Sequence, residues 1–331
     1  MYLQIFLESS EKIYIANFDG EIESEFSKFG DIPDSYGILL STIRFEGDGA
    51  ILIYGSNGFF KYSYYGETIN RQKLKNYEMP DRSFKTMGRG MEAVGNRYLY
   101  INQEFPPNRD YSKKSFLYDL HLLKWLYPDS GEIEPFIQFP EYSLFRNGKL
   151  FFRSAWDPAF HVEDGYIYVV FGLEPVIYVY QDTFPYNLVS ELPIQFKEFR
   201  NFTGTDDFTF EIEAFFDRFR SAFVENIKKI DDLFVIAYFP GYDQQDLSES
   251  NENKSPQERE AFLEKIAKKY PNRIAIVDST GNVINDFVPE GLEPSSMLVR
   301  DGQLWMMEKP NEEEEQDYFR LFRVGLKIEN Q

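Results

Sequence analysis

A short, tight turn recurs along this chain, and each copy separates two runs rich in β-branched and aromatic residues. A Gly- or Asp-containing turn between alternating apolar and polar runs is typical of a β-hairpin. The repeated hairpins constrain the chain to a sheet-rich fold. Four clear copies lie at residues 45–54, 93–101, 162–170 and 299–307, with a looser fifth copy at 229–236.

A second turn follows the hairpin, as in Ser130-Gly131 and Thr280-Gly281, so each repeat contains four strands. Repeated four-stranded antiparallel units are the pattern of a β-propeller. We therefore predict an all-β, six-bladed β-propeller that forms a single domain over residues 1–331, with two short helical insertions on one face. The blades are expected at about 1–30, 36–75, 84–140, 144–198, 222–290 and 294–328.

Composition supports a sheet, because aromatic residues fit pleated, half-buried surfaces and make up 18% of this chain. Counting back from Gly20 by the spacing of the next repeat indicates that blade 1 lacks its own first strand. Blade 6 ends in a short segment at 326–328. The ring is therefore expected to close imperfectly, or to use a strand from outside this sequence.

Charge and cysteine content narrow the function. A formal net charge of −20 repels phosphate backbones, so no nucleic-acid partner is expected in the absence of a local basic patch. With no cysteine, the chain has no disulfide, thiolate nucleophile or Cys-ligated metal. No catalytic or phosphate-binding motif is present, and we expect no cofactor and no metal site.

The chain contains no apolar run long enough to cross a bilayer, so direct membrane insertion is not expected. Residues 1–10 lack the features of a signal peptide and are predicted to be a strand. We expect a monomer.

Long insertions fall between the second and third strands of a repeat or between repeats, which is one face of a propeller. They lie at 102–115, 140–158, 199–222, 240–272 and 308–317. Apolar spacing from Ile212 and a capping box at Ser255-Pro-Gln-Glu258 predict a helix in two of them. Loops on a rigid scaffold commonly carry function, so this face is the predicted binding face.

His161 is the first candidate site residue, on an innermost strand just after Trp156 and Asp157. An imidazole with a carboxylate and an aromatic platform suits sugar binding or acid–base chemistry at the mouth of a central channel. The alternative is that His161 is a packed interior residue. His121 is predicted to lie on an outer strand with a structural role.

Arg44, Arg89 and Arg220 lie at or near innermost strands, as does Arg153, and converging arginines suit an anion. Ordinary ion pairing with the many carboxylates is the alternative. Glu92 is a further ligand-binding candidate on the elaborated side. Asp206, Asp207 and Glu225 are expected to be solvated.

The turns Tyr127-Pro-Asp-Ser-Gly-Glu132 and Val277-Asp-Ser-Thr-Gly-Asn282, the Asp-Gly turns and the closing Asp317–Arg323 strand give a pattern that resembles a bacterial family of six-bladed propellers of unknown function. That family is related in fold to TolB-like and NHL-like propellers. The resemblance implies a periplasmic or cell-envelope location. A cytoplasmic location is the alternative, because the chain shows no signal and no lipidated cysteine.

These observations predict a non-catalytic propeller that binds a peptide, a glycan or a partner protein through the face that carries the insertions. The alternative function is a hydrolase or lyase that acts on a sugar or lactone at the channel mouth, with His161 as acid or base.

Overall fold

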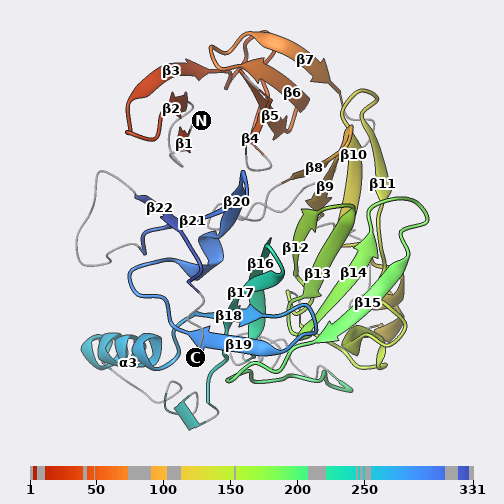
Figure 1. Ribbon diagram of the computed structural model, residues 1–331, viewed down its shortest axis with the longest axis vertical. Helices are drawn as coiled ribbons and strands as arrows, with labels where there is room; N and C mark the ends of the chain where they lie inside the picture. The colour runs from red at the N-terminus through yellow and green to blue at the C-terminus, as the bar shows by residue number, and fades with distance from the viewer. Residues whose placement is uncertain are drawn as a thin grey trace. The chain divides into compact units, whose positions relative to one another are not determined.

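The computed structural model describes residues 3–5, 12–39, 43–47, 49–73, 91–102, 113–152, 154–207, 221–243, 245–246, 249, 255–309 and 320–327. Their strands form separate antiparallel sheets in which neighbours along the chain are hydrogen-bonded neighbours in the sheet (Figure 1). Contacts divide the chain into two compact units. Unit 1 comprises Met1–Phe84, Arg89–Pro106 and His121–Ile137, and unit 2 comprises Lys85–Gly88, Pro107–Leu120 and Gln138–Gln331.

Unit 1 contains one three-stranded and two four-stranded sheets. The first is β1 (Leu3–Ile5), β2 (Lys12–Ala16) and β3 (Ile22–Ser27). The second is β4 (Arg44–Glu46), β5 (Ala50–Gly55), β6 (Gly58–Ser63) and β7 (Thr68–Gln72). The third is β8 (Glu92–Val94), β9 (Arg97–Ile101), β10 (Leu123–Tyr127) and β11 (Glu132–Pro135).

Unit 2 contains two four-stranded sheets and one three-stranded sheet. The first is β12 (Pro158–Glu163), β13 (Tyr166–Phe171), β14 (Val176–Gln181) and β15 (Leu188–Pro193). The second is β16 (Phe223–Ile230), β17 (Leu233–Phe239), β18 (Arg273–Val277) and β19 (Val283–Phe287). The third is β20 (Leu298–Arg300), β21 (Gln303–Met307) and β22 (Leu321–Val324).

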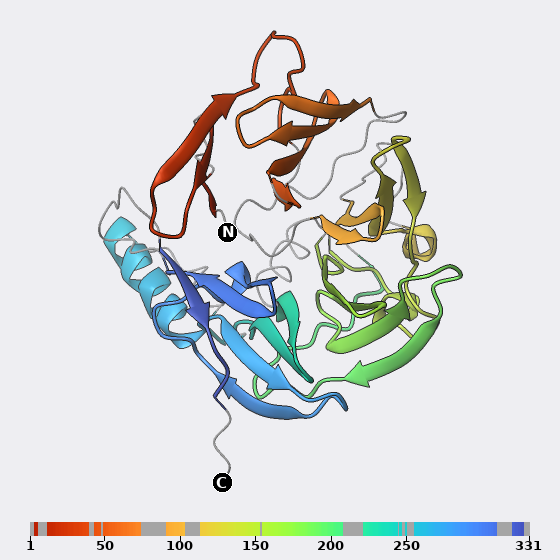
Figure 2. The ribbon, with the colours of Figure 1, turned by 45° about the horizontal axis from the view of Figure 1, so that its top comes forward.

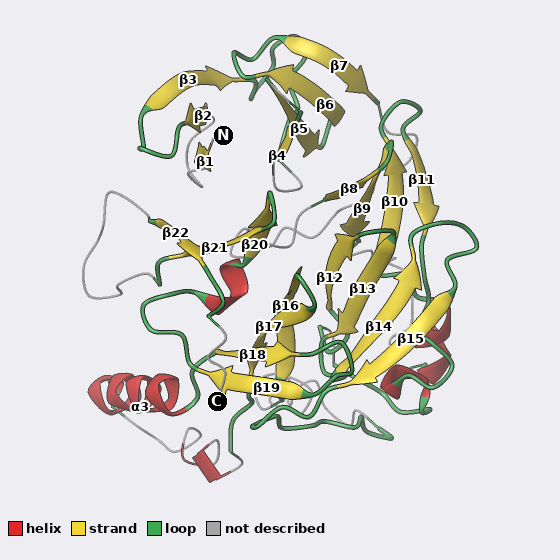
Figure 3. Ribbon diagram, viewed as in Figure 1, coloured by secondary structure: helices red, strands yellow, loops and turns green. Residues whose placement is uncertain are grey.

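The helical segments lie in connections between strands (Figure 3). They are the 3-10 helices η1 (Lys114–Asp119), η2 (Leu144–Arg146) and η3 (Pro294–Ser296), and the α-helix α3 (Pro256–Lys269). Within the described ranges, no helix has the length and apolar character that a bilayer span requires.

The predicted hairpin turns are confirmed. Asp164-Gly165 joins β12 to β13, with φ of 50° and 81°, and Asp301-Gly302 joins β20 to β21, with φ of 51° and 69°. Two successive left-handed residues match the twist of the flanking strands, which explains the Asp-Gly sequence. The second set of turns is also confirmed, since Gly20, Gly66, Gly131 and Gly281 precede the outermost strands β3, β7, β11 and β19.

The first and last sheets each have three strands in the part of the chain that the structure describes. The number of blades in a closed ring and the organisation as a single domain stay predictions.

The capping box predicts α3 correctly. Ser255 Oγ accepts a hydrogen bond from Glu258 N, and Glu258 Oε2 accepts one from Ser255 N at 2.8 Å, which satisfies two backbone donors at the start of the helix. The other predicted helix, from Ile212, falls mostly on residues 208–220, outside the described residues. The assignment of His121 to a strand is wrong, because β10 begins at Leu123.

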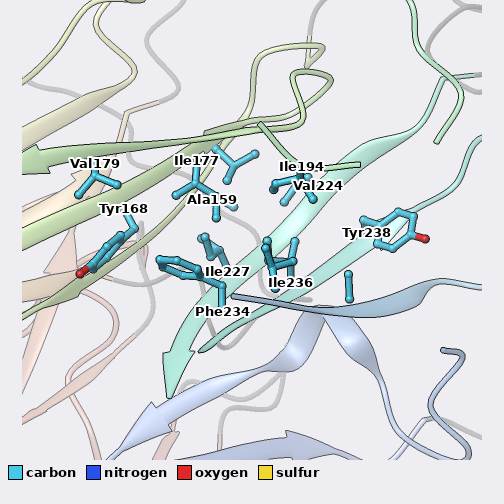
Figure 4. Close-up of a cluster of buried hydrophobic side chains, with 13 residues drawn as sticks. Ala159, Tyr168, Ile177, Val179, Ile194, Val224, Ile227, Phe234, Ile236 and Tyr238 are labelled. Atoms are coloured by element: carbon cyan, nitrogen blue, oxygen red, sulfur yellow. The ribbon is translucent and has the colours of Figure 1, made fainter. Parts of the chain in front are cut away.

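The sheet β12–β15 and the sheet β16–β19 close a buried cluster between them (Figure 4). Tyr168 and Ile177 from the first sheet lie toward Ile227 and Phe234 from the second, and the rings of Tyr168 and Phe234 are 5.1 Å apart. In each sheet the four strands lie side by side in chain order (Figure 2). We call this cluster the seam of unit 2.

Candidate functional site

An open pocket of about 590 Å³ lies in unit 1, between the connection from β3 to β4 and the sheet β4–β7. This volume is in the range of small-ligand sites, roughly 300–1,000 Å³. We call it the loop pocket. Its lining residues are Gly30, Asp31, Ile32, Pro33, Asp34 and Ser35 of the connection, Ser56, Asn57, Gly58 and Phe60 of the β5–β6 hairpin, and Arg71, Gln72 and Lys73 at the end of β7.

The floor of the loop pocket is aromatic. Phe60 is buried, and its ring is stacked on that of Tyr62 with centroids 5.6 Å apart. Arg71 is the cross-strand partner of Phe60, so both side chains leave the same face of the sheet. The pocket therefore has an apolar base with a guanidinium at its edge.

Backbone hydrogen bonds hold the outer wall, residues 28–39, against the β5–β6 hairpin. Ser56 N donates to Ile38 O at 2.8 Å, and Asn57 N donates to Tyr36 O at 3.1 Å. The side-chain amide of Asn57 donates to Ser35 O at 3.1 Å. These bonds fix the course of the loop independently of any ligand.

Two glycines permit this close contact. A Cβ at Gly55 would overlap the carbonyl oxygen of Tyr36, and a Cβ at Gly37, where φ is 73°, would overlap Ser56 Oγ. A larger residue at either position must push the loop and the hairpin apart. The two glycines therefore allow the loop to pack directly against the hairpin in this arrangement.

An ion pair bridges the two walls at the rim. Arg71 of β7 contacts Asp34 of the loop at 2.8 Å, and their side chains are 64% and 37% exposed. The buried Tyr62 hydroxyl donates to Asp34 O at 2.6 Å, and burial raises the pKa of this hydroxyl, so it stays protonated. Asp31 and Lys73 add one charge of each sign to the rim.

Of the predicted site residues of unit 2 that the structure describes, His161 and Trp156 are buried. His161 of β12 is 7% exposed and stacks on Tyr168, its partner in β13, at 6.5 Å. Trp156 is 2% exposed and packs among Phe116 and Phe145 at 6.0 and 6.4 Å. Asp157 is half-buried, and its backbone oxygen accepts from Gly172 N at 3.0 Å.

The structure brings two other candidates together. Arg44 of β4 and Glu92 of β8 form an ion pair of 3.0 Å, and the Arg44 guanidinium also donates to the Met91 carbonyl. This contact matches the alternative interpretation of Arg44, in which the arginine forms an ordinary ion pair with a carboxylate. Arg89, Arg220 and Arg153 lie outside the described residues.

Two of the carboxylates expected to be solvated, Asp206 and Glu225, contact a polar side chain. Asp206 pairs with Lys149 at 2.6 Å on the surface, and Glu225 accepts from Asn272 at 2.9 Å. No group of three His, Asp or Glu residues with metal-binding geometry occurs within the ranges given for the structure.

The sequence did not predict the loop pocket. The run Gly30-Asp-Ile-Pro-Asp-Ser35 is a polar, turn-forming connection, and Gly55-Ser-Asn-Gly58 has the sequence of an ordinary hairpin turn. The sequence does show that both connections contain glycine, one between two repeats and the other within the second of these repeats. Their contact in space could not be deduced from spacing alone.

No family model matches the sequence, and no curated protein matches it. Among solved structures, the chain is similar to a member of the DUF4221 family from Bacteroides vulgatus, with a TM-score of 0.64 and 12% identity over 98% of this chain and 90% of that chain. A functionally unknown protein from Desulfotomaculum acetoxidans matches with a TM-score of 0.45 and 8% identity, over 99% of this chain and 81% of that chain.

The likeness to the Bacteroides vulgatus protein shows the fold. This chain has an all-β, propeller-type fold, with one α-helix, α3, among its described elements. At 12% identity the likeness extends to the fold alone, since one fold supports many functions.

Proposed function

We propose that this protein is a non-catalytic binding protein and that its ligand occupies the loop pocket. The observation that carries the proposal is a pocket of about 590 Å³ whose outer wall is fixed by backbone hydrogen bonds. A site that is already formed binds without the entropic cost of ordering a loop. The rim is exposed, so a ligand can enter.

The position of the pocket supports the face predicted from the sequence. Its walls come from the β5–β6 connection and from the connection that leads into β4, which are the two kinds of connection assigned to the binding face. We further propose that the six sheets are the six blades of one ring.

The chemistry of the lining favours binding over catalysis. Among the described lining residues there is no His, Cys or Tyr, Asp34 is engaged by Arg71, and the Ser35 and Ser56 hydroxyls accept hydrogen bonds from backbone N–H groups of the loop. General acid–base catalysis requires a group within hydrogen-bond reach of the substrate. The hydrolase or lyase alternative relied on His161, and its burial gives that alternative no support.

A ligand screen with the full chain tests this function. We would record thermal unfolding of wild type with neutral oligosaccharides, short peptides and small carboxylates. A ligand at 100 times its Kd stabilises the folded state by about 2.7 kcal/mol. The variant Asn57→Ala, which alters the pocket wall, should lose that stabilisation, and mass spectrometry should recover the ligand unchanged.

Lys12→Gln is the matched control. Lys12 forms an exposed ion pair with Glu25 at 2.9 Å in the same unit, away from the pocket lining. It should keep the full ligand response. A chemically converted ligand, or a response that Asn57→Ala leaves intact, would contradict the proposal.

A further inference from the structure

We infer that the ligand of the loop pocket is an uncharged, hydroxyl-rich molecule, and specifically a neutral oligosaccharide. The inference rests on the proposed function and adds the chemical class of the ligand. Three features of the rim and floor support it: balanced charge, donors placed beside acceptors, and a small apolar surface.

The charge balance disfavours ions. An anionic ligand would meet the carboxylates of Asp31 and Asp34, on a chain whose net charge is −20. A cationic ligand would meet the positive side chains of Arg71 and Lys73. A charged ligand must also be stripped of water before it enters, and at the Arg71–Asp34 ion pair it meets a like charge beside the opposite one. An uncharged ligand avoids both costs.

The ion pair at the rim suits adjacent hydroxyl groups. A guanidinium only donates hydrogen bonds and a carboxylate only accepts them, and here the two lie 2.8 Å apart. Each hydroxyl of a sugar both donates and accepts, so two neighbouring hydroxyls can bridge Arg71 and Asp34 without separating them. Asn57, on the facing hairpin, has an amide that offers both kinds of partner.

The apolar surface of the pocket is small and lies in the floor and at one side of the rim. Phe60 is buried in the floor, while Ile32 is 43% exposed and Pro33 is exposed beside it. This surface can cover the C–H face of a sugar ring. Peptide and protein partners are normally anchored by a large side chain in a desolvated apolar pocket, whereas the described lining of this open pocket places charged side chains along its rim.

The test compares matched ligands on the full-length chain. A glycan array that carries neutral hexose oligosaccharides, their uronic-acid counterparts and their amino-sugar counterparts would be probed with labelled protein, alongside a peptide array. We expect binding to neutral glycans at least tenfold tighter than to the charged counterparts. Hits would be measured by titration calorimetry.

The variants Arg71→Gln and Asp34→Asn test the role of the rim. Arg71 is mostly exposed and Asp34 partly so, so both variants should fold. Each should weaken binding of the neutral glycan about tenfold, the usual effect of losing a charge-assisted hydrogen bond of about 1.5 kcal/mol. Lys12→Gln, which breaks a comparable surface ion pair, should bind as wild type does.

The outcomes separate the inference from the function. Pocket-dependent binding of a peptide or of a charged glycan overturns the ligand class and keeps the binding function. Binding that ignores Arg71→Gln, Asp34→Asn and Asn57→Ala, or no binding on either array, overturns both.

Discussion

The seam of unit 2 and the loop pocket of unit 1 both lie beside a four-stranded sheet, but side chains fill the seam whereas the loop pocket is open. Aliphatic and aromatic side chains fill the seam, and residues such as Ile227 and Phe234 are almost wholly buried there. The loop pocket is bounded by a connection that is tied down through its backbone, with charged side chains at the rim. Side-chain packing closes a space, whereas backbone hydrogen bonding can hold one open.

The largest expected effect breaks the seam. Phe234→Ala removes a buried ring that contacts Tyr168 and should lower the free energy of unfolding by about 4 kcal/mol. Ile32→Ala at the pocket rim should change it by less than about 0.5 kcal/mol, because that side chain is largely exposed. Urea denaturation of both variants checks this contrast. Similar losses in the two would show that the pocket rim is part of a core.

The next effect attacks the wall of the pocket. Gly55→Ala places a methyl group against the Tyr36 carbonyl and should cost about 3 kcal/mol while also abolishing ligand binding. Gly20→Ala, in the open β2–β3 turn with φ of 85°, meets no neighbouring atom and should cost about 1 kcal/mol through backbone strain alone. Equal losses, or retained binding in Gly55→Ala, would refute a fixed wall.

A pH-dependent effect concerns the buried carboxyl of Glu174 in unit 2. Burial raises the pKa of Glu174, which accepts hydrogen bonds from Leu144 N and from Ser143 Oγ at 2.8 Å. A raised folded-state pKa means that the contribution of this group to stability is fully present below its unfolded pKa of about 4.3 and is lost as pH rises through the folded value.

The variant Glu174→Gln cannot ionise. Its stability relative to wild type should therefore improve as pH rises from about 4 to 7. Denaturation curves at both pH values measure the difference. A difference that stays constant, or one with the opposite slope, would show that the hydrogen bonds outweigh burial at this carboxyl.

The smallest effect is local to one hairpin. Hydrogen bonds from the Thr280 side chain and from the Asn282 backbone lower the pKa of Asp278 to about 2. The stabilisation from this turn is therefore present above the unfolded pKa of about 3.9 and is lost as pH falls through about 2. A carboxyl NMR titration follows this directly. Titration near pH 4 would show that these bonds do not form in solution.

Local structure could be predicted from the sequence where one short motif determines it. The Asp164-Gly165 turn and the Ser255 capping box each specify their own backbone, and both appear where expected. The loop pocket depends instead on a contact between residues 35–38 and 56–57, which no local pattern encodes. The burial of Trp156 has the same origin, because it depends on which side chains face a neighbouring sheet or loop.

The backbone ties between the 28–39 loop and the β5–β6 hairpin also bear on how this protein can evolve. Those ties use main-chain groups, the side chains of Ser56 and Asn57 and two glycines, so they are largely indifferent to the side chains at positions 31, 32, 33 and 73. Substitutions at these exposed rim positions can therefore accumulate at little cost to stability. Descendants of this chain can exchange one ligand for another while the architecture beneath stays unchanged.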